Sequence, residues 1–181
     1  MKLPVALANT RYVAVAQEQD ALVTPADLAA WLRAARPELA TPLAEAALAS
    51  VTDRHVEAAR SLREAIRSVA SASTGGESVS PAELEAINAV GRAASMWVEL
   101  RGSRVLQVVP VHSGDAVDAA LAEVAHSAVE MLAAAEIWAC GAPSCIKFFA
   151  KDHPRKEWCS DSCGNRVRAA RHYARTRHAS D

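Results

Sequence analysis

All four cysteines of this 181-residue chain lie within its last 42 residues, in two local pairs. Four residues separate Cys140 from Cys145, thirteen more lead to Cys159, and three separate Cys159 from Cys163. Zn²⁺ prefers four tetrahedral ligands and binds thiolates well. A segment of about 42 residues rarely buries enough apolar surface to fold alone. The spacing therefore predicts a four-cysteine site that holds one structural zinc ion and orders a small module.

The alternatives for these thiols are two disulfides, free thiols in a core, or an iron–sulfur cluster. The first ten residues contain one lysine and a short apolar stretch that Pro4 and Asn9 interrupt, so they do not resemble a secretory signal peptide. We therefore expect a cytoplasmic, reducing setting, in which closely paired cysteines favour metal ligation. Four thiolates leave no open position for an activated water, so the predicted zinc is structural rather than catalytic.

Residues 140–181 are predicted to fold as a treble-clef-like finger, with a knuckle, a β-hairpin and a final helix. The Gly and Pro between the first two cysteines suit a tight knuckle, and residues 146–158 are long enough for the hairpin. At about 100° per residue, the helix presents one face to the metal and to a small core. That predicted face comprises Cys159, Cys163, Val167, Ala170 and Ala174.

Charge changes at the same point in the chain as cysteine content. Residues 1–139 carry 11 Lys and Arg against 17 Asp and Glu, a net charge of −6, whereas residues 140–181 carry 9 against 4, a net charge of +5. This coincidence predicts two domains, one over residues 1–136 and the finger over 137–181. The whole chain carries only −1, so any attraction for an anionic partner is confined to the finger.

The segment after Cys163 is rich in arginine and has one acidic residue, at its end. Arg168, Arg171 and Arg175 fall within about 60° of one another on a helical wheel. Arginine's planar fork suits phosphate oxygens and the guanine edge in the major groove. Asn165 is placed either against an adenine or, as we favour, against backbone groups that brace the knuckle. The candidate nucleic-acid-binding residues are Lys147, Asn165, Arg166, Arg168, Arg171, Arg175 and Arg177.

Residues 1–136 are predicted to be mostly helical. Alanine, the best helix former, makes up 41 of the 181 residues, whereas the aromatic fraction of 4% is low for an all-β fold. Three Ser or Thr residues that precede prolines suit helix N-caps, with proline in the first helical position. The predicted helices cover residues 25–36, 42–70 with a bend near 52–53, 81–94, and a last stretch from 113–118 toward Trp138.

A small amount of β-structure is predicted within this helical part. Residues 96–100 and 104–111 are rich in β-branched and aromatic residues and flank a short Gly-containing loop, which indicates a hairpin. Residues 3–7 are a candidate strand that Pro4 weakens, and residues 71–78 are predicted to be a flexible loop. The expected fold class is α+β and mostly helical, with an α-rich domain and small sheet followed by the finger.

The run Cys163-Gly164-Asn165-Arg166 resembles the signature of the bacterial CGNR zinc-finger proteins, which pair this finger with an N-terminal ABATE domain. The WCS segment at 158–160, the basic segment at 166–177 and the first cysteine pair with Phe148 are similar to the family's finger. The LANT segment at 7–10, and Leu22 with TPADL at 24–28, are similar to ABATE landmarks. The resemblance covers essentially the whole chain.

That family is described as stress-induced transcriptional regulators whose finger binds DNA, so the resemblance implies a bacterial, DNA-binding regulator of the stress response. It also implies that the four cysteines are the zinc ligands and that Gly164, Asn165 and Arg166 complete the signature. We expect DNA as the partner, together with the transcription machinery and a second copy in a homodimer. The alternative is a zinc-stabilised adapter that binds proteins and does not contact nucleic acid directly, or an ordinary solvated helix face.

No catalytic residues are predicted, and we do not expect an enzyme. Glu123-x2-His126 resembles half of a di-iron motif, but the sequence has no second copy. His55 and His112 have acidic neighbours of the kind that any sequence contains. No apolar run approaches the ~18 residues of a membrane span, so no membrane association is expected.

Overall fold

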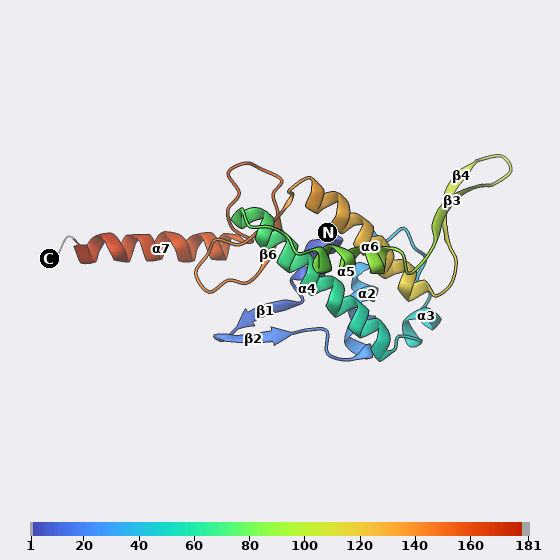
Figure 1. Ribbon diagram of the computed structural model, residues 1–181, viewed down its shortest axis with the longest axis horizontal. Helices are drawn as coiled ribbons and strands as arrows, with labels where there is room; N and C mark the ends of the chain where they lie inside the picture. The colour runs from blue at the N-terminus through green and yellow to red at the C-terminus, as the bar shows by residue number, and fades with distance from the viewer. Residues whose placement is uncertain (1, 179–181) are drawn as a thin grey trace.

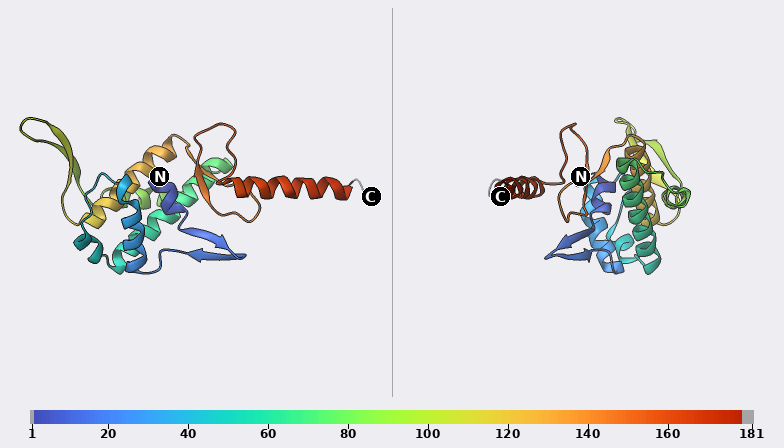
Figure 2. Two further views of the ribbon diagram at one scale, coloured as in Figure 1. Left: turned by 180° about the vertical axis from the view of Figure 1, so that it is seen from behind. Right: turned by 60° about the vertical axis from the view of Figure 1, so that its left-hand side comes forward.

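The computed structural model describes residues 2–178, apart from the side chains at positions 172, 174 and 176–178. It contains a helical body, a β-hairpin that projects from one end of the body, and a C-terminal segment that ends in helix α7 (Asp161–His178). Helix α7 points away from the body at the end opposite the hairpin (Figure 1). The view from behind shows the same two projections (Figure 2). None of the described helices combines the length and hydropathy that a membrane span requires.

The body is an assembly of helices around one apolar core. They are α1 (Leu3–Ala8), α2 (Pro25–Ala35), the 3-10 helix η1 (Arg36–Glu38), α3 (Glu45–Ala49), α4 (Asp53–Gly75), α5 (Pro81–Gly91) and α6 (Ala116–Ala133). Helix α4 lies at the centre and packs against α1, α2, α5 and α6. Leu62 and Ile66 of α4, Leu7 of α1 and Val124 of α6 are fully buried in this core.

Side-chain caps start two of the longer helices where the sequence predicts. The Thr24 hydroxyl accepts a hydrogen bond from the Asp27 N–H, and the Asp27 carboxylate accepts one from the Thr24 N–H at 2.8 Å. Ser80 and Glu83 form the same reciprocal arrangement at α5. Such bonds satisfy N–H groups that have no partner within the helix. The helix starts predicted after Thr24 and Ser80 are confirmed.

The strands form three separate two-stranded antiparallel hairpins. They are β1 (Arg11–Ala14) with β2 (Gln17–Asp20), β3 (Met96–Arg101) with β4 (Gln107–His112), and β5 (Ile137–Ala139) with β6 (Phe148–Ala150). The β3–β4 pair confirms the hairpin predicted at 96–111. Together with the helical body, these small hairpins confirm the α+β, mostly helical fold class.

A buried ion pair anchors β1–β2 to α4. Arg63 is 1% exposed, and its guanidinium donates to the two carboxylate oxygens of Asp20 at 2.5 and 2.8 Å and to Thr10 Oγ1 at 3.2 Å. The hydrogen bonds from Arg63 hold the pKa of Asp20 below its usual range. A buried guanidinium without such partners is strongly destabilising, so this network fixes the base of the hairpin on the body.

The N-terminal region differs from the prediction in two respects. Residues 3–7 belong to helix α1 rather than to a strand, because Pro4 lies in the first turn, where its missing N–H has no cost. Leu3 and Leu7 then share one buried helix face. The β1–β2 hairpin was not predicted, since β2 consists of the polar run QEQD and the turn residues Val15 and Ala16 have positive φ values of 51° and 60°.

The helix predicted over 42–70 is displaced and divided. The segment before α3 is not helical, because the Glu123 carboxylate of α6 accepts hydrogen bonds from the N–H groups of Ala40 and Thr41 at 2.6 and 2.9 Å. The gap between α3 and α4 coincides with the predicted bend. Helix α4 continues through most of the predicted loop and ends before Gly76, whose φ of 74° provides a left-handed cap.

Two helices end earlier than predicted. Helix α5 stops at Gly91 rather than near 94, and α6 stops at Ala133 rather than near Trp138. Ala135 has a φ of 53°, which no helix accommodates. The chain then pairs as strand β5, in which Trp138 is the middle residue.

Candidate metal centre

The four cysteine sulfur atoms converge on one point. All four lie within 4.8 Å of one another, and Sγ–Sγ distances are 3.7 Å for Cys145–Cys159, 3.6 Å for Cys159–Cys163 and 3.7 Å for Cys145–Cys163. Four sulfurs placed 2.3 Å from one zinc ion would be about 3.8 Å apart, whereas a disulfide requires ~2.05 Å. None of the four cysteines forms a disulfide. Their geometry fits one structural zinc ion and excludes the predicted alternative of two disulfides.

Hydrogen bonds of the cysteine backbone N–H groups position the four sulfur atoms. Cys140 follows β5, and its N–H donates to the Lys147 carbonyl at 2.9 Å, while the Cys145 N–H closes the knuckle onto the Ala142 carbonyl at 3.1 Å. The Cys159 N–H donates to Cys140 Sγ at 3.3 Å, which joins the two cysteine pairs. At the start of α7, the Cys163 N–H donates to Ser160 Oγ at 3.3 Å. The first helical turn therefore carries the last ligand.

The hairpin predicted over 146–158 is wrong, because the paired strands lie on either side of the knuckle. Ile137 pairs with Ala150 and Ala139 with Phe148, so the first two cysteines sit in the turn of the β5–β6 hairpin. Ile137 and Phe148 are 1% and 4% exposed and join the core of the body. This register buries both side chains. The segment 151–158 is an irregular loop that leads to the second cysteine pair.

The pKa values of the cysteine thiols depend on burial and on hydrogen bonds within the cluster. Burial is the main cause of the raised pKa of Cys145 and Cys159. Burial acts the same way on Cys163, but hydrogen bonding with Ser160, Cys159 and Arg166 brings its pKa down to about 7. Zn²⁺ binding requires thiolates and releases protons. Compared with Cys145 and Cys159, Cys163 is therefore closer to the thiolate form at neutral pH.

The three residues after Cys163 each have a local structural role. A Cβ on Gly164 would lie 3.0 Å from Trp158 Cδ1, so glycine lets α7 pack against this indole. Arg166 Nη2 donates to Cys163 Sγ at 3.1 Å. Asn165 Oδ1 accepts from Arg168 Nη2 at 2.5 Å, a different partner from the backbone groups that the sequence suggested. The motif thus packs and hydrogen-bonds the first turns of α7 beside the metal site.

Comparison with protein families covers both parts of the chain. A family model for ABATE, described as "Putative stress-induced transcription regulator", matches residues 2–135, and one for the CGNR zinc finger matches residues 137–176. The chain belongs to the ABATE family. No curated protein is significantly similar to it. The two family matches follow one another along the chain, ABATE first and the CGNR finger second, as the resemblance implies.

The CGNR finger is fastened to the ABATE body by Asn9 and Arg67. The Asn9 amide brackets the backbone of Phe148, accepting from its N–H at 2.7 Å and donating to its carbonyl at 2.9 Å. Arg67 of α4 donates to the carbonyls of Ala8 at 2.7 Å and Ile146 at 3.1 Å. Asn9 belongs to the ABATE-like LANT segment, whose sequence does not indicate a contact with the finger. No local sequence pattern identifies Arg67 as a residue that contacts the finger.

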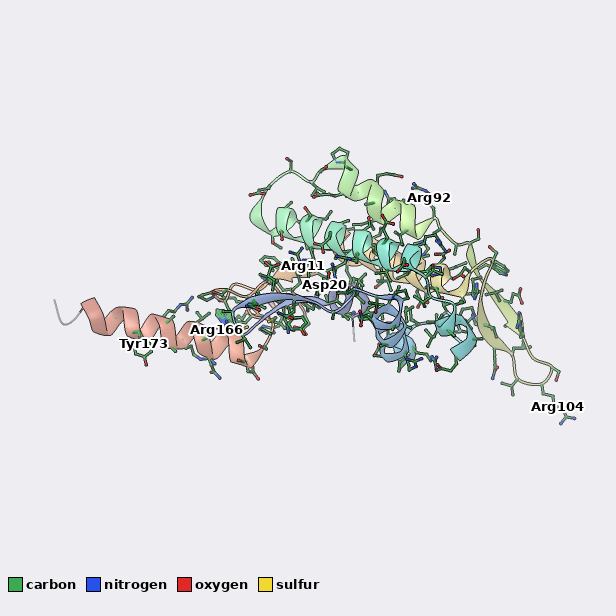
Figure 3. The ribbon with its side chains drawn as sticks, turned by 90° about the horizontal axis from the view of Figure 1, so that it is seen from below. Arg11, Asp20, Arg92, Arg104, Arg166 and Tyr173 are labelled. Carbon is green, nitrogen blue, oxygen red and sulfur yellow. The ribbon has the colours of Figure 1, made fainter. Side chains whose placement is uncertain are left out.

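A cavity of about 550 Å³ lies between the β1–β2 hairpin and the cysteine cluster. Val13 and Ala16 line it from the body, and Cys145, Cys159 and Arg166 line it from the finger. Figure 3 shows Arg166 at the base of α7, where the helix leaves this junction. The metal centre is therefore close to the seam between the two parts rather than at the free end of the finger.

The candidate nucleic-acid-binding residues fall into two groups. The first group contacts other side chains near the finger. The Lys147 ammonium lies 5.3 Å from the Tyr12 ring centroid. Arg166 donates to Cys163, and Arg168 donates to Asn165. Arg171 and Arg175 are exposed further along α7. The Arg171 guanidinium is 6.0 Å from the Trp158 ring centroid. The side chain of Arg177 lies outside the described residues.

The predicted buried face of α7 is shorter than the sequence suggested. Cys163 and Val167 are 5% and 7% exposed, but Ala170 is exposed, and the side chain of Ala174 lies outside the described residues. Beyond Val167 the helix leaves the small finger core and extends into solvent (Figure 1). Its distal part is thereby available to a large partner.

Two other polar clusters have structural partners. His55, Asp115 and Asp118 place ligand atoms within 4.8 Å of one another, a grouping that the sequence analysis did not identify. Asp118 of this group is already paired with Arg54, whose guanidinium donates to the carboxylate at 2.9 and 3.0 Å. Glu123 caps backbone N–H groups before α3, as described above. These contacts tie α3 and α4 to α6.

Proposed function

We propose that this protein is a transcriptional regulator that binds DNA through helix α7 of its CGNR finger. The family match supports a regulator, and the exposed arginines on a helix that projects from the body carry the proposal of DNA contact. The major groove is ~12 Å wide and admits an α-helix. A helix that remained against the body could not enter it. The proposal includes no catalytic step.

Arg171 and Arg175 are the residues that we assign to phosphate contact. Both are exposed on the part of α7 that extends beyond the finger core. Among the side chains that the structure describes, no carboxylate forms an ion pair with either guanidinium. Arg166 and Arg168 are held by Cys163 and Asn165, so we assign them to positioning the helix. Arginine binds phosphate oxygens in a planar, bidentate manner.

A second basic surface adjoins the helix and supports the same assignment. A hollow of about 330 Å³ is lined by Trp138, Trp158, Lys151, Lys156 and Arg171 together with Glu157. Lys156 is paired with Asp152 at 3.0 Å, so Lys151 and Arg171 are the cations that we assign to this surface. The Lys151 ammonium lies 3.3 Å from the Trp138 ring centroid. Cations held against aromatic rings lose little side-chain freedom when they bind an anion. This hollow extends the positively charged surface from α7 onto the loop of the finger.

The test is fluorescence anisotropy, in which a labelled random DNA duplex is titrated with zinc-loaded protein. The titration is repeated at about 50 and 200 mM salt to obtain the salt dependence of the affinity. The double variant Arg171→Ala/Arg175→Ala is compared with Arg33→Ala/Arg92→Ala, which removes the same charge from exposed positions on α2 and at the end of α5. We expect log affinity to fall linearly with log salt, and the slope to decrease by about two only in the α7 variant.

Zinc content and far-UV circular dichroism must be equal in the three proteins, so that lost binding reports lost contacts. Equal loss in both variants would indicate a non-specific charge effect and contradict the assignment to α7. Absence of duplex binding by the zinc-loaded wild-type protein would contradict DNA binding and favour the protein adapter. As a DNA-binding regulator the protein would act in the cytoplasm of a bacterial cell, and its response to stress belongs to the same proposal.

A further inference from the structure

The β3–β4 hairpin, residues 96–112, is an arm that projects from the body. Its strands pair with each other from Met96↔His112 to Arg101↔Gln107. In both Figure 1 and Figure 2 the ribbon extends away from the helices, with Arg104 near its tip in Figure 3. At the base of the arm, Met96 packs against Ala94, Ala119 and Ala122. A two-stranded hairpin without a packing partner along its length is marginally stable in water at best. Something that covers one of its faces would explain why these residues form strands.

One face of the arm is adapted to solvent. Side chains alternate along a strand, so Trp97, Glu99 and Arg101 of β3 share this face with Gln107, Val109 and Val111 of β4. Val109 and Val111 are half-buried. The Glu99 carboxylate accepts from Trp97 Nε1 at 3.1 Å and from the Arg101 guanidinium at 2.7 and 2.9 Å. Arg101 keeps the pKa of Glu99 below its usual range. These polar groups satisfy one another without any further partner.

The opposite face, here called the apolar face, comprises Met96, Val98 and Leu100 of β3 with Val108 and Pro110 of β4, and His112 at its base. Val98 is 68%, Leu100 66% and Val108 68% exposed. An antiparallel sheet with alternating apolar and polar side chains normally buries its apolar face. Val105 and Leu106, 73% and 60% exposed, extend the apolar surface to the tip. The sequence pattern therefore belongs to a half-buried ribbon, although the isolated chain leaves it open.

We propose that the apolar face of the arm packs against the same face of a second copy of this chain, in a two-fold symmetric dimer. A two-fold interface requires a surface that is complementary to itself. The apolar face meets this requirement because Glu99 and Arg101 point to the other side. Its one titratable side chain, the half-buried His112, lies at the base of the arm, away from Val98, Leu100 and Val108. Two such ribbons can stack face to face about 10 Å apart.

The exposed area supports a second copy as the occupant. The exposed side chains of the apolar face and tip amount to roughly 600 Å², of the same order as the ~800 Å² that each partner contributes to a standard interface. Among the other large apolar side chains exposed in the described part of the chain, Trp97 lies on the opposite face of the arm, whereas Val15, Val23 and Leu84 lie elsewhere in the sequence. The arm itself is thus the extended apolar surface that this chain offers to its copy.

The position of the arm also suits such a dimer. Residues 1–139 carry a net charge of −6, so two bodies in direct contact would repel one another. Contact through projecting arms keeps these bodies apart. The finger and α7 lie at the opposite end of the molecule from the arm and remain free (Figure 1). The dimer does not depend on DNA binding, and it is measured without DNA.

The test is sedimentation equilibrium of the zinc-loaded full chain over a range of concentrations, compared for two matched double variants. Val98→Thr/Val108→Thr changes the apolar face, and Val109→Thr/Val111→Thr makes the same chemical change on the other face of the arm. Threonine retains β-propensity. We expect a wild-type dimer, a dissociation constant raised roughly 100-fold or more by the first variant, and little change with the second.

Melting temperature and zinc content of the variants report whether each remains folded. A wild-type protein that sediments as a monomer at every concentration would overturn the proposal. So would a dimer that is weakened equally by both variants or by neither, because its interface would then lie elsewhere.

Discussion

The ABATE body encloses a core contributed by most of its helices, whereas the CGNR finger buries only Cys140, Ala142, Cys163 and Val167 in a core of its own, among the described residues. Two of these four residues are metal ligands. The body can therefore be stable through apolar burial alone, but the finger requires the metal and its contacts with the body. This chain therefore has two sources of stability, apolar burial in the body and metal binding in the finger, and mutations or metal removal should affect them separately.

Removing the metal should have the largest effect and should affect the finger alone. Structural zinc contributes about 10–16 kcal/mol in finger peptides, so chelation or Cys163→Ser is expected to abolish order around the cysteines. Hydrogen exchange should show lost protection in residues 140–167 and unchanged protection in α4 and α6. Re-addition of zinc after chelation should restore it. Loss of protection in the body at the same time would show that the stability of the body also depends on the metal.

Removing the buried ion pair should have the next largest effect, and should destabilise the body. Asp20→Ala removes the two hydrogen bonds from the buried Arg63 guanidinium to Asp20 but leaves the one from its Nε to Glu64 at 2.9 Å. The cost should therefore lie near the lower end of the about 3–5 kcal/mol that breaking a buried pair typically has. The control Glu18→Ala removes an exposed ion pair with Arg11 and should cost at most about 1 kcal/mol. Urea unfolding followed by circular dichroism measures both. Equal costs would contradict the role of the buried pair.

The same pair predicts a pH dependence of definite sign. The folded-state pKa of Asp20 is lowered by Arg63, so its contribution is fully present above the unfolded value near 3.8 and is lost as the pH falls through the folded pKa. The difference in unfolding free energy between wild type and Asp20→Ala should therefore be constant near neutral pH and shrink in acid. A difference that grew on acidification would refute this linkage.

Breaking the contact between the two parts should have an intermediate effect. Asn9→Ala removes both hydrogen bonds to the Phe148 backbone, and an unsatisfied buried group costs about 1–3 kcal/mol. We expect zinc to be lost to a competing chelator roughly tenfold faster, with Asn88→Ala on the exposed face of α5 as the control. An unchanged rate in Asn9→Ala would mean that the finger does not depend on the body.

The smallest expected effect tests the packing of α7. Gly164→Ala places a methyl group about 3.0 Å from Trp158 Cδ1, which should offset the ~1 kcal/mol that alanine normally adds to a helix and weaken zinc binding severalfold. Gly75→Ala, whose new Cβ would have no neighbour closer than 3.9 Å, should instead stabilise α4 slightly. Chelator competition and thermal melting compare the two. Tighter zinc binding in Gly164→Ala would argue against the steric role.

Sequence patterns within a few residues predicted much of the fold and of the site. The cysteine spacing predicted the zinc cluster, the caps at Thr24 and Ser80 predicted two helix starts, and the β-rich runs around residue 102 predicted β3–β4. Each of these features depends on groups that are neighbours in the chain. Local propensity and spacing are sufficient for such features because little else competes with them.

Other parts of the fold depended on residues that are distant in sequence. The strand partner of β6 was mispredicted because the burial of Ile137 and Phe148 in the body decides its register. The start of the helix near residue 42 was mispredicted because Glu123 binds the preceding backbone. No short pattern records such contacts, since the competing local choice is equally acceptable until the tertiary partner is present.

By itself, the sequence determined that this chain is mostly helical, that its four thiols form one zinc site and that residues 140–181 carry a net positive charge. The tertiary structure alone decided that Asn9 and Arg67 fasten the finger to the body, that α7 leaves its core after Val167, and that the β3–β4 arm stands free. The physical reason is the range of the interactions. Caps, ligand spacing and charge are local, whereas burial and buried hydrogen bonds depend on which distant surfaces meet.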